Sequence, residues 1–98
     1  MRSSKLESGF QDRLIKQLEE MFPGCMIFKM DQMQGIPDLL ILWNGHWAAL
    51  ECKKHSEAHR QPNQEYYVDK MNRMSFSRFI FPENKEEVLN DLQSAFRT

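Results

Sequence analysis

The dipeptide Asn44-Gly45, set between two apolar runs, constrains the fold of this chain more than any other feature. Asn-Gly is the strongest short signal for a two-residue β-hairpin turn of type I′, in which both central residues adopt a positive φ. The sequence therefore predicts an antiparallel hairpin of strands 38–43 and 46–53. Because a two-residue turn fixes the register of the strands that it joins, this hairpin also predicts which side chains face each other.

The predicted register places Asp38 directly opposite Glu51, and Lys53 points to the same face because side chains alternate along a strand. Two carboxylates in opposed positions destabilise a ladder, unless a positive charge lies between them. A divalent cation is one solution, since carboxylate oxygens are the ligands that Mg²⁺ or Mn²⁺ takes. The alternative is an acidic pair bridged by Lys53 at the end of the hairpin, with no catalytic role.

The remaining elements are predicted from apolar periodicity and from helix and strand terminators. A first amphipathic helix covers residues 4–21, and a strand covers 25–30. After the hairpin, a helix opens at Gln61-Pro62, where proline is favoured at the first position; Tyr66, Tyr67, Met71 and Met74 form its apolar side. A strand at 78–81 and a helix at 82–97 complete the order α-β-β-β-α-β-α.

This order describes an α/β fold with a mixed central sheet flanked by helices, and residues 1–98 are expected to form one domain. Both faces of the hairpin are apolar. Such a sheet must be covered on both sides by helices or by a second subunit, so we expect a homodimer.

Composition bounds the location and the partners of the protein. No run approaches the roughly 18 apolar residues of a membrane span, and the first residues do not resemble a signal peptide. Cys25 and Cys52 fit no metal-binding spacing and no disulfide framework, which favours a reducing cytoplasm. With 13 basic and 14 acidic residues, the formal net charge is −1. Contact with nucleic acid would therefore depend on local basic residues and metal ions rather than on bulk charge.

Glu7 is a second unusual carboxylate, because it projects close to Leu14 and Leu18 on the inward stripe of the first helix. It has two interpretations. Ser4 and Glu7 have the spacing of a capping box, in which Glu7 bonds back to the Ser4 amide. Alternatively, Glu7 contributes to a metal site.

The motif Gly35-Ile36-Pro37-Asp38, followed by Glu51-Cys52-Lys53, resembles the PD-(D/E)XK nuclease signature. With Glu7 before it and Gln64 after it, the pattern resembles the VRR-NUC family in its compact stand-alone form, of the kind often carried by bacteriophages. The resemblance covers nearly the whole chain and implies a restriction-endonuclease-like fold and a metal-dependent DNA endonuclease. A phage-encoded member would work in the cytoplasm of the host cell.

The resemblance also implies a role for each matching position. Asp38, Glu51 and the backbone carbonyl of Cys52 would hold Mg²⁺ or Mn²⁺, with Glu7 joining directly or through water. Lys53 would orient the attacking water and stabilise the charged phosphorus centre. Gln64 would occupy the family's glutamine position beside the metal and Lys53.

Stand-alone members resemble Holliday-junction resolvases, which implies a homodimer with two active sites that acts on branched DNA. The candidates for contact with the DNA backbone are the basic residues around the predicted site: Arg2, Lys5, Arg13, Lys53, Lys54, His55, His59 and Arg60.

Two other functions compete with the nuclease. The first is a non-catalytic module that binds branched DNA or assists assembly while retaining the fold, which the small size and near-neutral charge would suit. The second is a hydrolase of small phosphoesters, although the sequence has no glycine-rich phosphate loop.

Overall fold

The Asn44-Gly45 turn forms as predicted, with φ of 53° at Asn44 and 84° at Gly45. It joins β2 (Leu39–Trp43) to β3 (His46–Cys52) in antiparallel register, with Trp43 opposite His46 and Leu39 opposite Leu50. The computed structural model describes residues 5–97 of the chain, and the side chains of residues 9–97. The predicted register is therefore confirmed as far as the pair Leu39 and Leu50, which are the sequence neighbours of Asp38 and Glu51.

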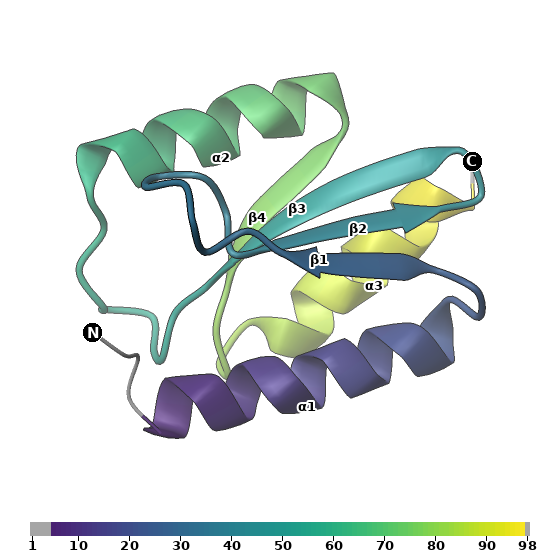
Figure 1. Ribbon diagram of the computed structural model, residues 1–98, viewed down its shortest axis with the longest axis horizontal. Helices are drawn as coiled ribbons and strands as arrows, with labels where there is room; N and C mark the ends of the chain where they lie inside the picture. The colour runs from purple at the N-terminus through teal and green to yellow at the C-terminus, as the bar shows by residue number, and fades with distance from the viewer. Residues whose placement is uncertain (1–4, 98) are drawn as a thin grey trace.

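The element order of the described residues is α-β-β-β-α-β-α, as the sequence predicts. In addition to the hairpin it comprises α1 (Lys5–Met21), β1 (Met26–Lys29), α2 (Pro62–Met74), β4 (Phe76–Ile80) and α3 (Lys85–Phe96). The strands form one mixed sheet in the order β1-β2-β3-β4 (Figure 1). The first three strands are antiparallel, and β4 pairs in parallel with β3 after the α2 crossover.

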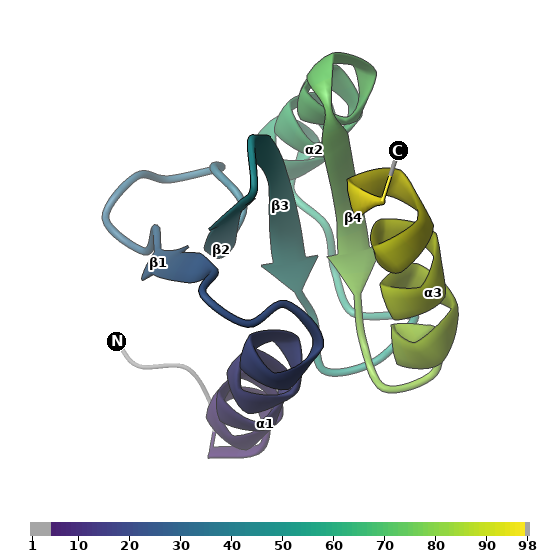
Figure 2. The same cartoon turned by 90° about the vertical axis from the view of Figure 1, so that its right-hand side faces the viewer.

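The hydrophobic core lies on one face of this sheet, which we call the core face. It packs α1 and α3 against alternate residues of the central strands, including Leu39, Ile41 and Leu50, all fully buried. Figure 2 shows both helices on that side of the sheet and α2 on the other. Phe22 and Phe96 contact Trp43 at the tip of the hairpin, with ring centroids 5.0 and 6.1 Å from that of Trp43.

The opposite face, which we call the site face, carries Leu40, Leu42, Trp47, Ala49 and Glu51 by alternation along the strands. α2 packs on this face over β3 and β4. On the neighbouring strands, Met26, Phe28 and Leu42 expose 55, 42 and 36% of their surface. The sequence predicts that both faces are covered, by helices or by a second subunit. Helices cover the core face, whereas they cover the site face only in part.

The structure corrects the predicted starts of two elements and one residue of a predicted apolar side. β4 begins at Phe76 rather than Arg78, because Phe76 pairs with Ala48 and the Ser77 hydroxyl donates to the Ala49 carbonyl at 2.8 Å. α3 begins at Lys85 rather than at residue 82, because residues 81–84 form a turn in which the Phe81 amide donates to Asn84 Oδ1. Met74 is exposed, so the predicted apolar side of α2 is wrong at that position.

The side of α2 that packs on the sheet is shifted relative to the predicted one. Tyr67 and Met71 are half-buried as predicted, but the buried residue is Val68, which the prediction did not include, and Tyr66 is 55% exposed. Because α2 is largely polar, its helical period places the apolar side only approximately, and packing against β3 and β4 selects the orientation that buries Val68.

Gly35 is the second position where backbone conformation governs the fold. Its φ is 91°, and a Cβ added there would lie 2.6 Å from Asn63 Nδ2 at the start of α2. The loop that leads to Asp38 therefore packs directly on the first turn of α2.

Gly35→Ala should lower the free energy of unfolding by about 1–3 kcal/mol, because alanine is strained at positive φ and would displace Asn63. Gly9→Ala is the matched control. Gly9 lies within α1, where its Cβ would approach only the flexible end of Arg13 at 3.2 Å, and alanine there should stabilise by about 0.5–1 kcal/mol. Urea denaturation measures both changes, and equal effects of the two substitutions would contradict this interpretation of Gly35.

Candidate active site

The candidate active site is built at the end of the hairpin opposite to its turn. Glu51 lies near the end of β3 and is only 4% exposed. A carboxylate buried to this degree needs hydrogen-bonding or charged partners. Gln64, in the first turn of α2, supplies one of them, because its Nε2 donates to Glu51 Oε2 at 3.0 Å.

Lys53 completes the cluster from the residue after β3. Its Nζ lies 3.8 Å from Glu51 Oε2 and donates to Gln64 Oε1 at 2.9 Å, while the side chain is 13% exposed. A second hydrogen bond of 3.1 Å runs from Nζ to the His59 carbonyl. Since an ammonium group has three N–H donors, these two bonds leave one donor for another acceptor.

Asp38 lies beside this cluster, directly before β2. Its Oδ2 accepts a hydrogen bond of 3.1 Å from the backbone amide of Cys52, the residue that follows Glu51. The Asp38 carbonyl in turn accepts from the Met30 amide at 2.7 Å. The carboxylate and the backbone carbonyl of Asp38 thus each accept a hydrogen bond from a neighbouring segment. These bonds hold the carboxylate next to the end of β3.

Gln64 has a third contact that the sequence did not suggest. Its Oε1 also accepts from the Gln61 backbone amide at 3.0 Å, the contact that a capping box makes at a helix start. One side-chain amide therefore begins α2, accepts from Lys53 and donates to Glu51.

The structure brings together four of the predicted site residues: Asp38, Glu51, Lys53 and Gln64. Cys52 is buried, and it pairs with Ile80 of β4. The side chains of Glu7 and Lys5, and all of Arg2 and Ser4, lie outside the described residues, so the predicted metal and capping roles of Glu7 and the predicted DNA contacts of Lys5 and Arg2 stay predictions.

The predicted basic residues are placed at different distances from this cluster. Lys54, His55 and His59 are exposed in the segment that joins β3 to α2. Arg60, in the same segment, is half-buried, with its guanidinium carbon 4.0 Å from the centre of the Phe79 ring. Arg13 is exposed on α1, which belongs to the core face and not to the site face.

The carboxylates of the candidate site can be compared with the ligands that the predicted Mg²⁺ or Mn²⁺ requires. Within residues 9–97, no three histidine, cysteine, aspartate or glutamate side chains form a metal-binding group. Mg²⁺ is nevertheless commonly held by one or two carboxylates together with water and substrate phosphate. Asp38 and Glu51, held at the end of one hairpin, match that requirement in ligand type and number.

Sequence reasoning missed Phe79, which is the direct partner of Glu51 in the parallel β3–β4 ladder. It lies within a strand predicted to start only one residue earlier, and its aromatic character alone did not distinguish it from core residues.

No helix in residues 5–97 is long and apolar enough to cross a membrane. No protein-family model, curated protein or solved structure matches the chain.

Gln64→Met removes an acceptor and a donor with little change in side-chain volume. Because Lys53 and Glu51 would lose their shared partner, the free energy of unfolding should fall by about 1–3 kcal/mol. The same substitution at the exposed Gln34 should change it by less than about 0.5 kcal/mol. Chemical denaturation of both variants provides the measurement, and a Gln64→Met protein as stable as the wild type would show that the cluster contributes nothing to folding.

Proposed function

We propose that the protein is a metal-dependent endonuclease of the PD-(D/E)XK type, related to the VRR-NUC family, that hydrolyses phosphodiester bonds in DNA. The observation that supports this most strongly is the convergence of Glu51, Lys53 and Gln64 in one hydrogen-bonded cluster beside Asp38. These are the residues in the Asp-Glu-x-Lys pattern and its following glutamine.

Each described residue has a chemical role in this proposal. Asp38 and Glu51, with the Cys52 carbonyl, would hold Mg²⁺ or Mn²⁺. The chemistry that a bound cation supplies is polarisation of the phosphate and neutralisation of developing charge. Lys53 presents an ammonium donor to the attacking water or to a phosphate oxygen. Gln64 orients Lys53 and Glu51 relative to each other, which pre-organises the site before substrate enters.

A second candidate is a module that binds branched DNA or assists assembly without cleaving it. It is favoured by the completeness of the internal contacts. No buried side-chain nitrogen or oxygen of the described residues lacks a hydrogen-bond partner, and Lys53 lies within ion-pair distance of Glu51. A bridged acidic pair of this kind also serves as a purely structural contact. Catalysis must therefore be measured, and the two candidates differ in whether the phosphodiester bond is broken.

Wild-type protein should cleave DNA in Mg²⁺ or Mn²⁺ and not in EDTA, and Glu51→Gln should lower the rate by at least about 100-fold. The assay uses a four-way junction, a flap, a single strand and a linear duplex, each labelled at a defined end. Glu20→Gln, at an exposed position of α1, is the control and should retain wild-type activity. Paired cuts in the junction alone would support selectivity for branched DNA.

Two outcomes would change the proposal. Equal cleavage of all four substrates would keep the nuclease and remove the selectivity for branches. Binding to the junction without cleavage in either metal would favour the non-catalytic module.

We also propose that the protein acts as a homodimer that associates through the exposed part of the site face. Met26, Phe28 and Leu42 lie on neighbouring strands, because Met26 pairs with Leu42 and Phe28 pairs with Leu40. Directly paired residues share a face of the sheet, so their exposed side chains form one continuous apolar surface. Contiguous surfaces of this kind commonly mark protein interfaces, and a two-fold dimer would match the symmetry of a four-way junction.

Phe28→Glu should convert a dimer to the 11.7 kDa monomer, because the charge would be buried without a partner in the interface. Met74→Glu is the control, since Met74 is also exposed but lies at the end of α2. Sedimentation velocity at micromolar concentration distinguishes the species. A monomeric wild-type protein would remove the dimer and the argument for paired cuts.

A further inference from the structure

Arg60, one of the predicted backbone contacts, has a side chain that packs against the fold. Its guanidinium lies over the Phe79 ring, with the central carbon 4.0 Å from the ring centre. A cation–π contact of this kind orients an arginine without using its N–H groups. Arg60 makes no hydrogen bond or ion pair with the residues that the structure describes. The five N–H donors of this half-buried side chain thus remain for an acceptor from outside the protein, and their positive charge favours an anion.

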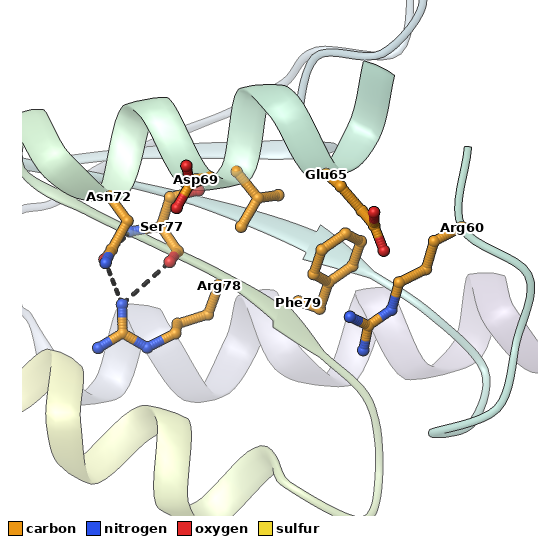
Figure 3. Close-up of a pocket in the computed structure, with 8 residues that line it drawn as sticks. Arg60, Glu65, Asp69, Asn72, Ser77, Arg78 and Phe79 are labelled. Atoms are coloured by element: carbon orange, nitrogen blue, oxygen red, sulfur yellow. Dashed lines mark hydrogen bonds between the residues drawn. The ribbon is translucent and has the colours of Figure 1, made fainter. Parts of the chain in front are cut away.

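Arg78 lines the same pocket between α2 and β4 as Arg60, but its contacts differ. Its guanidinium lies over Phe76 at 4.2 Å, but its Nη1 also donates to the Asn72 side chain and to the Ser77 carbonyl (Figure 3). Arg78 therefore joins α2 to the edge of β4 and has a structural role. Arg60 has no comparable internal acceptor.

Two observations place Arg60 next to the cluster of Glu51, Lys53 and Gln64. Phe79, on which it stacks, is the parallel partner of Glu51 across the β3–β4 ladder, and paired strands are separated by about 4.8 Å. The residue before Arg60 is His59, whose carbonyl accepts the hydrogen bond from Lys53 Nζ. A DNA strand with one phosphate at Lys53 would therefore continue past Arg60.

The charged neighbour that opposes such a contact is Glu65. It lines the pocket of about 360 Å³ between α2 and β4 together with Arg60, and Figure 3 shows its side chain on the Arg60 side of the pocket. No ion pair joins it to Arg60 among the described contacts. Asp69, the second acid of this pocket, is already paired with Arg73. Of the two acids that line this pocket, Glu65 is therefore the one expected to repel an anion at Arg60.

We propose that Arg60, oriented by Phe79, binds the DNA phosphate next to the one that is cleaved, so that the site selects a polynucleotide over a small phosphoester. This inference rests on the proposed nuclease function and names a substrate contact for the same site. Arg60 acts on binding of the strand and not on the reacting atoms.

The test compares four variants in DNA cleavage with constant Mg²⁺ and 50 to 200 mM KCl. Arg60→Met keeps the apolar cover of Phe79 but removes the charge. It should raise KM several-fold and reduce the slope of log KM against log salt by about 0.9 on a duplex arm, the value for one phosphate contact. Arg60→Lys should retain the wild-type salt slope, because it keeps the charge.

Glu65→Gln should lower KM, since it removes the opposing carboxylate. Arg97→Met, at an exposed arginine that follows α3 on the core face, is the matched control and should leave KM and the slope as in the wild type.

The outcomes separate this inference from the function on which it rests. If wild-type protein cleaves DNA and Glu51→Gln does not, while Arg60→Met keeps the wild-type KM and salt slope, the phosphate contact is wrong and the nuclease stands. If Arg60→Met and Arg60→Lys raise KM equally without changing the salt slope, Arg60 only supports Phe79 and the contact is again wrong. If wild-type protein cleaves no DNA in either metal, the proposed function fails and the contact with it.

Discussion

The burial of the Glu51 carboxylate is the constraint on which the arrangement around the sheet depends. A charge that is 4% exposed is tolerated only when hydrogen-bonded and charged partners replace water. Two of its partners come from separate segments, Lys53 beyond β3 and Gln64 on α2. Satisfying Glu51 therefore fixes where α2 starts relative to the sheet, and with it the course of the segment between them. The parallel β4 strand then follows from the end of α2.

The hairpin was predictable because its determinants are local. Asn44 and Gly45 adopt positive φ in a turn that admits few other residues, and the register follows from that turn by counting. The neighbourhood of Asp38, Glu51 and Lys53 could be inferred for the same reason. Each step of the inference used only covalent connectivity and the alternation of side chains along a strand.

The parts that could not be predicted depend on docking between distant segments. Phe76 and Ser77 form strand because β3 is available as a parallel partner, although a serine-flanked sequence gives little local signal for it. Val68 is the buried residue of α2 because of how the helix lies on β3 and β4, and the exposure of Tyr66 follows from the same orientation. Gln64 was expected near Lys53 from the resemblance, but its bond to the Gln61 amide is visible only when the helix start is placed.

The shared use of the Gln64 amide links the secondary structure of α2 to the chemistry of the cluster. Helix ends fray more readily than helix centres, and such openings commonly involve contiguous groups that act as one unit. Here the first turn of α2 and the orientation of Lys53 and Glu51 depend on the same side chain. Unwinding of that turn would release Lys53 from Gln64, and a substrate that draws Lys53 away would remove one support of the turn. In the proposed nuclease, local unfolding at the start of this helix would therefore be thermodynamically coupled to substrate binding.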